Sequence, residues 1–139
     1  MQPTHSSHEA PYQAEPRSVW AALRAGLAMR CPNCREGKLF RSYLKVSDRC
    51  PVCGEAFYHH RADDAPAYFT ILIVGHIVLP LMLATLEFTS IPQWMHFIIW
   101  PTLATAMTFT FLPRIKGALV ALQWALRMHG FQNEEAIAE

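Results

Sequence analysis

One feature constrains this chain more than any other: between Asp64 and Arg114 it carries a single charged residue, Glu87. Two apolar runs, residues 67–88 and 94–112, fill this stretch. About 20 consecutive apolar residues are needed for a helix to cross a bilayer, so the runs predict a two-helix transmembrane hairpin. The core of a soluble protein is the alternative, and two uninterrupted runs of this length side by side disfavour it.

The basic residues predict the orientation of the hairpin. All 12 Lys and Arg side chains fall before Ala67 or after Leu112, and the loop between the two runs has none. Loops on the cytoplasmic side of a membrane carry an excess of these residues. We therefore expect both termini to face the cytoplasm.

The segments that flank the hairpin are short. Apolar residues recur at three- and four-residue spacing in residues 18–30, which predicts an amphipathic helix on the membrane surface. Residues 114–131 place Lys116, Gln123 and Arg127 on one helical stripe and predict a second interfacial helix. A third crossing is the alternative there, but the segment is short and carries three basic residues. The remaining segments are a disordered tail at 1–17 with no signal-peptide pattern, a polar linker at 59–66 and a tail at 132–139.

Four cysteines precede the hairpin in the pattern C-x2-C, fifteen residues, C-x2-C; they are Cys31, Cys34, Cys50 and Cys53. This spacing is typical of a zinc site closed by four thiolates, with no coordination position left for a substrate. Lys38 to Val46 alternates enough to supply short strands, so residues 31–58 predict a zinc ribbon. The fold class we expect is a mainly α membrane protein: a transmembrane hairpin, an N-terminal zinc ribbon with short β strands, and flanking interfacial helices.

Two alternatives to zinc remain at this point. The first is two disulfides or four free thiols; disulfides are disfavoured because the cysteines precede the first crossing on the positive-rich side, where the cytosol is reducing. Iron is the stronger rival, since CPxCG also occurs in rubredoxin-type sites and four thiolates bind either metal. Zinc is favoured by its availability and its preference for closed structural sites.

A second polar group lies where the ribbon meets the hairpin: His59, His60, Asp63 and Asp64. Two imidazoles and two carboxylates are a candidate second metal site or catalytic group. We favour a structural role, because carboxylates stabilise the positive end of a helix and Asp64 is placed to cap the helix that begins near Pro66.

Three polar residues interrupt the hairpin: His76, Glu87 and His96. His76 lies near the middle of the first run, where an ionisable side chain must face a partner and is a functional candidate by default. A hydrogen bond to a threonine such as Thr105 would satisfy it, and haem or copper ligation is the alternative. Glu87 and His96 lie near the outer end of the hairpin, where each can reach interfacial water or the other. We expect them to pair, in a structural role.

The motifs along the chain resemble those of a known family. The segments CPNCREGKLF, DRCPVCGEAF, RADDAPAYF, IVGHIVLP and LPRIKGALVALQWALRMHG follow one another between Ala25 and Gly130. On these motifs the chain resembles the bacterial domain-of-unknown-function family 983, small inner-membrane proteins with a ribbon followed by a hairpin. Arg35 departs from the pattern, because glycine is expected at that position of the first knuckle.

The resemblance implies a location in the bacterial inner membrane and assigns no activity. Members of the family often sit among genes for haem-copper oxidase subunits and their assembly factors, which implies a role around respiratory complexes. We therefore expect a non-enzymatic accessory or assembly protein without catalytic residues. Its partners would be the lipid bilayer and a larger membrane complex such as cytochrome c oxidase, with the ribbon as a cytoplasmic docking module.

Two other functional classes were weighed against this one. The first is a membrane enzyme or a metal or haem carrier, and it would use His59, His60, Asp63, Asp64 and His76. The second is a nucleic-acid-binding ribbon, for which the chain is too evenly charged: the net charge is +1 and acidic residues are interspersed around the cysteines.

Overall fold

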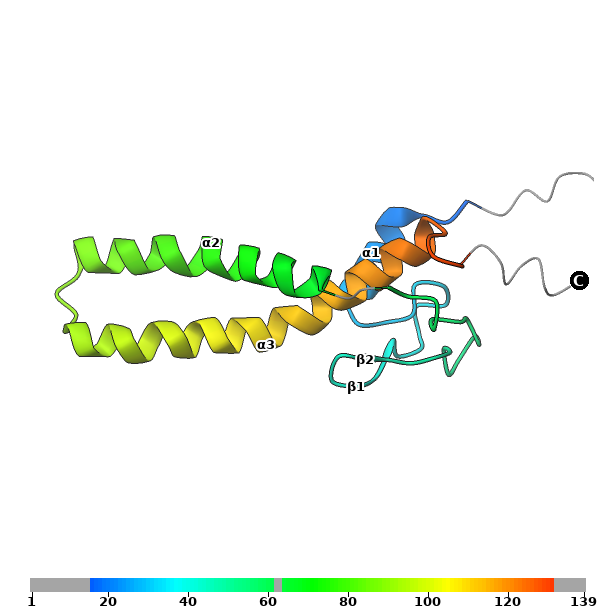
Figure 1. Cartoon of the computed structure of the whole chain (residues 1–139), viewed down its shortest axis with the longest axis horizontal. Coiled ribbons are helices and arrows are strands. Elements are labelled where there is room, and N and C mark those ends of the chain that lie inside the picture. Colours follow the sequence, from blue (N-terminus) through cyan, green and yellow to red (C-terminus); the bar gives the residue numbers. More distant parts are fainter. Residues whose placement is uncertain (1–15, 62–63, 132–139) are drawn as a thin grey trace, which may run out of the picture.

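The computed structural model describes residues 16–61 and 64–131. Its elements are helix α1 (Val19–Leu27), strands β1 (Phe40–Ser42) and β2 (Lys45–Val46), and helices α2 (Ala65–Phe88) and α3 (Gln93–Ala125). Helices α2 and α3 form a long hairpin, and α1, the strands and the end of α3 gather at its open end (Figure 1). Most of the predicted N-terminal tail, all of the C-terminal tail and Asp63 lie outside the described residues.

Both long helices are long and apolar enough to cross a membrane. At about 1.5 Å per residue, the 24 residues of α2 and the 33 of α3 extend over roughly 36 and 50 Å. The apolar core of a bilayer is about 30 Å thick. A core helix of a soluble protein would be mostly buried, whereas only 11% of the most apolar window of α2 and 6% of that of α3 are buried.

Helix α3 continues through the position where the sequence predicts a break. We predicted separate helices at 94–112 and 114–131, and this prediction is wrong, because one helix runs across Pro113 to Ala125. Proline has no N–H, so the carbonyl of Phe109 four residues earlier loses its usual donor. The hydroxyl of Tyr43 in the ribbon donates to that carbonyl at 3.0 Å. The helix therefore continues with the acceptor satisfied.

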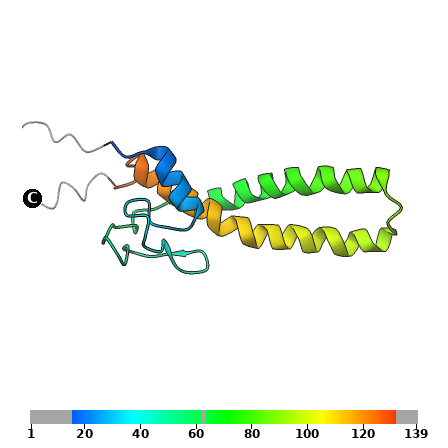
Figure 2. The ribbon, with the colours of Figure 1, turned by 180° about the vertical axis from the view of Figure 1, so that it is seen from behind.

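Helix α1 packs against the second half of α3 (Figure 2). Ser18 caps its first turn by accepting the N–H of Ala21 at 3.3 Å. Its buried residues are Ala22, Ala25 and Gly26. Those of α3 in this region are Gly117, Val120, Ala121, Trp124 and Ala125. The amphipathic pattern predicted the helix, but small residues make its contact with α3, and the apolar Trp20 and Leu27 stay 70% and 45% exposed.

The two helices cross with their backbones in contact at a pair of glycines. A Cβ on Gly26 would collide with the carbonyl oxygen of Gly117 and would lie 2.7 Å from the Cβ of Ala121. A Cβ on Gly117 would in turn collide with the carbonyl oxygen of Gly26. Only glycine permits so close an approach on both sides.

The strands form a small antiparallel hairpin in which Phe40 pairs with Val46 and Ser42 with Lys45. One hydrophobic core joins this hairpin to α1 and α3. It comprises Ala22, Cys31, Leu39, Val46, Cys50, Phe57, Val120, Ala121, Trp124, Ala125 and Phe131. The ribbon, α1 and the end of α3, which we predicted as separate segments, therefore share one hydrophobic core at the base of the helical hairpin.

Candidate metal centre

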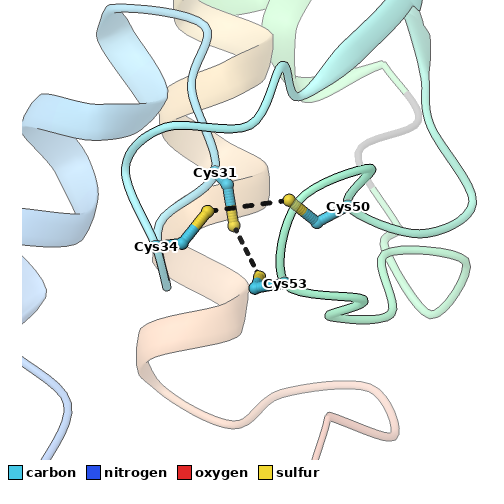
Figure 3. A group of neighbouring side chains, drawn as sticks. All are labelled: Cys31, Cys34, Cys50 and Cys53. Atoms are coloured by element: carbon cyan, nitrogen blue, oxygen red, sulfur yellow. Dashed lines mark hydrogen bonds between the residues drawn. The ribbon is translucent and has the colours of Figure 1, made fainter.

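The four cysteines converge on one point, as their spacing predicts (Figure 3). All four sulfur atoms lie within 4.8 Å of one another, and the pairs Cys31–Cys53 and Cys34–Cys50 are each separated by 3.7 Å. Four sulfurs at about 2.3 Å from a tetrahedral ion are about 3.8 Å apart, whereas a disulfide requires about 2.05 Å. The cysteines are free thiols whose arrangement fits a four-coordinate metal ion.

Each C-x2-C segment turns around this point with the same backbone geometry. The N–H of Arg35 donates to the carbonyl of Cys31 at 2.9 Å, and that of Gly54 donates to Cys50 at 3.0 Å. The donor residues have φ values of 62° and 77°, in the left-handed region. Glycine adopts this conformation at no cost, whereas another residue pays about 1 kcal/mol. Arg35 therefore makes in the first knuckle the same turn that Gly54 makes in the second, with some backbone strain.

Backbone N–H groups lower the pKa of the cysteine thiols, whereas burial raises it. The N–H of Gly37 points at the sulfur of Cys34 at 3.4 Å and is the main cause that lowers the pKa of Cys34 to about 6. Burial raises the pKa of Cys31 and Cys53. A cation at the centre of the four sulfurs would favour the thiolate form of each.

Gly37 is a site residue that the sequence analysis missed. A Cβ at this position would collide with the sulfur of Cys50. Its carbonyl also accepts the N–H of Cys31 at 2.8 Å. The sequence shows a glycine three residues after the second cysteine. Only the folded chain shows that this glycine faces Cys50 in the opposite knuckle.

A carboxylate connects the metal centre to α3. Glu55 follows the second knuckle, and its two oxygens accept the indole N–H of Trp124 at 2.8 Å and the amide of Asn33 at 3.1 Å. Arg17 holds the other side of Trp124, with its guanidinium 4.3 Å from the ring centre and a 2.8 Å bond to the Trp124 carbonyl. Both knuckles are thereby tied to the same turn of α3.

The candidate second metal site does not assemble in the described part of the chain. His59 lies against aromatic rings, with centroid distances of 4.1 Å to Tyr58 and 5.8 Å to Phe131. His60 donates through Nδ1 to the carbonyl of Phe57 at 2.6 Å. Over residues 16–61 and 64–131, the four cysteines are the only group of His, Cys, Asp or Glu with the geometry of a metal site.

Asp64 takes the N-cap position of α2, as predicted, but its side chain makes no capping hydrogen bond. Its carbonyl accepts the N–H groups of Ala67 and Tyr68 at 3.1 and 3.2 Å. Proline follows within the first turn of the helix, where its missing N–H costs nothing.

His76 faces away from α3. Its Nδ1 donates to the carbonyl of Leu72 in its own helix at 2.8 Å, and not to Thr105, the partner suggested by the sequence. Thr70 and Val74 are the α2 residues buried near this depth. His76 is two residues beyond Val74 and is thus rotated by about 200° from the face that contacts α3. The side chain is exposed.

The predicted pair between Glu87 and His96 is also wrong. His96 accepts the indole N–H of Trp100 through Nδ1 at 2.9 Å, one turn along α3. No ion pair joins His96 to Glu87 among the residues that the structure describes. The i, i+4 spacing of His96 and Trp100 within one helix brings the rings together.

Fold and site together define a small helical protein in which a four-cysteine cluster is built onto the base of a hairpin long and apolar enough to cross a membrane. The chain belongs to the family described as protein of unknown function (DUF983), whose model matches residues 40–124. The match confirms the resemblance seen in the motifs, and it begins after the first knuckle. No curated protein and no solved structure matches the chain.

Proposed function

We propose that the protein is a non-enzymatic accessory or assembly protein of the bacterial inner membrane that acts by association with a larger membrane complex. The hairpin crosses the bilayer, and the ribbon with its structural zinc lies on the cytoplasmic side. A haem-copper oxidase is the partner that the family resemblance suggests. The observation that carries the proposal is the face of α2 that bears His76.

This face offers hydrogen-bond acceptors that the chain does not use. The carbonyl of Leu72 can only accept, so Nδ1 of His76 carries the proton, and in the neutral ring Nε2 is an acceptor. Pro80 lies four residues after His76 and lacks an N–H, so the His76 carbonyl also loses its usual donor. In a bilayer neither group would face bulk water, and a neighbouring helix that supplies donors would satisfy both.

The surroundings of His76 suit a packed helix. Gly75 has open space where a Cβ would be, with nothing within 4 Å. Small residues let transmembrane helices approach closely, and polar side chains then bond across the contact. A partner helix that supplies donors near His76 fits this face better than lipid does.

The metal centre supports a structural and not a catalytic role for the ribbon. Four sulfurs would occupy all the coordination positions of a tetrahedral ion, so none is left for a substrate. Zinc is the ion proposed, because closed four-thiolate sites of this spacing are typical of structural zinc. The basic residues around Arg114 and before Ala67 favour the cytoplasm for this end of the molecule.

Co-purification from membranes tests the proposal. A tagged full-length chain is expected to recover a haem-copper oxidase, measured by haem absorbance per mole of zinc. His76→Ala removes one acceptor and should lower recovery about fivefold, the effect of roughly 1 kcal/mol for one intramembrane hydrogen bond. Leu81→Ala, at the exposed apolar position that directly follows the proline of α2, is the matched control and should leave recovery unchanged.

A carrier of haem or copper is the second candidate, and the geometry of His76 favours it over an enzyme. A metal-ligating histidine usually donates its other ring N–H to a carbonyl or carboxylate, as Nδ1 does here. The purified, partner-free chain would then bind haem with a spectrum that His76→Ala abolishes. That result, or substrate turnover by the purified chain, would overturn the proposal in favour of the carrier or the enzyme.

A further inference from the structure

A groove of about 490 Å³ lies between the ribbon and α3, where the apolar part of α3 ends. On the α3 side it is lined by Phe109, Thr110 and Pro113. On the ribbon side it is lined by the β1–β2 hairpin and its approach, which contribute Lys38 and Arg41. Arg114, the first charged residue after the apolar stretch, follows immediately. The groove therefore lies at the boundary between the apolar span and the charged base of the molecule.

The groove is held open by two bonds between the ribbon turn and α3. Tyr43 donates its hydroxyl to the Phe109 carbonyl at 3.0 Å. Lys116 donates its ammonium to the Leu44 carbonyl at 2.7 Å. Because both bonds fix the turn directly against the helix, the ribbon wall and the α3 wall keep their separation.

The two kinds of lining residue have different chemistry. Phe40, Leu44 and Phe109 supply apolar surface, whereas Lys38 and Arg41 supply positive charge, and no lining residue is acidic. In the described part of the chain Lys38 has no ion pair, and Arg41 has one long contact of 3.8 Å with the exposed carboxylate of Asp48. An anion can therefore approach both cations.

We infer that this groove binds an anionic phospholipid from the leaflet that the ribbon faces. The phosphate lies at Lys38 and Arg41, and an acyl chain lies along Phe109. Amphipathic surface at a membrane boundary with exposed basic residues matches a lipid with a charged headgroup. The inference goes beyond the proposed function: it needs the hairpin to lie in a bilayer, and it is independent of any protein partner.

Native mass spectrometry of the full-length chain in neutral detergent tests the inference. The protein is titrated with dioleoyl phosphatidylglycerol, with dioleoyl phosphatidylcholine, and with soluble glycerol phosphate. Phosphatidylglycerol should be retained in preference to phosphatidylcholine. Lys38→Gln combined with Arg41→Gln should weaken phosphatidylglycerol binding by about thirtyfold, the effect of two basic residues near an anionic lipid.

A second pair of substitutions controls for net charge. Arg24→Gln combined with Arg35→Gln removes the same charge from exposed positions outside the groove, and phosphatidylglycerol binding should stay as in the wild type. Equal losses for both pairs would show only non-specific attraction and would overturn the inference. So would an unchanged affinity after the Lys38 and Arg41 substitutions.

Three further measurements distinguish binding of the whole lipid from binding of its headgroup alone and from misfolding. Phe109→Ala keeps the charges and the backbone carbonyl, and should weaken phosphatidylglycerol about tenfold through lost apolar contact. Glycerol phosphate should not compete; competition at equal concentration would identify a soluble phosphate site and contradict the inference. Metal content at the wild-type level shows that each variant has folded, because the cysteines share the core with the ribbon strands.

Discussion

A methyl group on Gly26 is expected to force α1 away from α3. Alanine normally stabilises a helix relative to glycine by up to about 1 kcal/mol. Here its Cβ would collide with the carbonyl oxygen of Gly117 and lie 2.7 Å from the Cβ of Ala121. Neither the backbone carbonyl nor the Cβ of Ala121 can rotate away, so the helices must separate. Overpacking of this kind costs roughly 1–3 kcal/mol.

The cost should appear at the metal centre, because Cys31 and Cys50 belong to the same core as Ala121. For a unit of this size, 1–3 kcal/mol lowers the melting temperature by about 5–20 °C. The assay is thermal release of metal to a chromogenic chelator from the full-length protein in detergent. Gly75→Ala is the matched control, since its Cβ meets nothing within 4 Å, and it should melt at or above the wild-type temperature. If the Gly26→Ala and Gly75→Ala variants have the same melting temperature, α1 does not pack against α3 as described.

Three further outcomes follow from the ribbon and its turn. Arg35→Gly relieves the left-handed backbone and should raise stability by about 0.5–1 kcal/mol, whereas Gly54→Ala should lower it by about 1–2 kcal/mol, both measured by the same chelator assay. Tyr43→Phe removes the donor to the carbonyl that Pro113 leaves unpaired and should lower stability by about 1 kcal/mol, with amide exchange in α3 as the readout. Metal affinity should fall as the pH is lowered, because protons compete for the thiolates. Since burial raises the pKa of Cys31, metal uptake at pH 7.5 should release protons, which a pH indicator in weak buffer would count.

Features with a local signal were predictable from the sequence. The apolar runs predicted both long helices, and the spacing of the cysteines predicted the cluster, because each signal lies in a short stretch of chain. The bond between His96 and Trp100 was available in the same way, since the two residues are four apart in one helix. We instead expected His96 to pair with Glu87, because both residues lie near the outer end of the hairpin.

Features that depend on distant residues were not predictable. Pro113 signalled the end of a helix, and the donor that satisfies the carbonyl it leaves unpaired is Tyr43, 66 residues away in sequence. Nothing near Gly26 or Gly117 in the sequence shows that glycine is required there, because the requirement arises only where α1 crosses α3. The bond between Glu55 and Trp124 likewise joins positions 69 residues apart. A single sequence does not show such pairs. They are the contacts that join the ribbon and α1 to α3.

Association through the His76 face of α2 can be measured directly by photo-crosslinking in intact cells. Leu83 lies two turns beyond His76 on the same face, and Ile98 lies equally far from the connecting loop on α3. Their exposed fractions are nearly equal, 55% and 59%. A photoreactive residue at Leu83 should give a discrete adduct with a membrane protein, and the same residue at Ile98 should give only lipid. Equal adducts at both positions, or none at Leu83, would contradict a function that depends on this face.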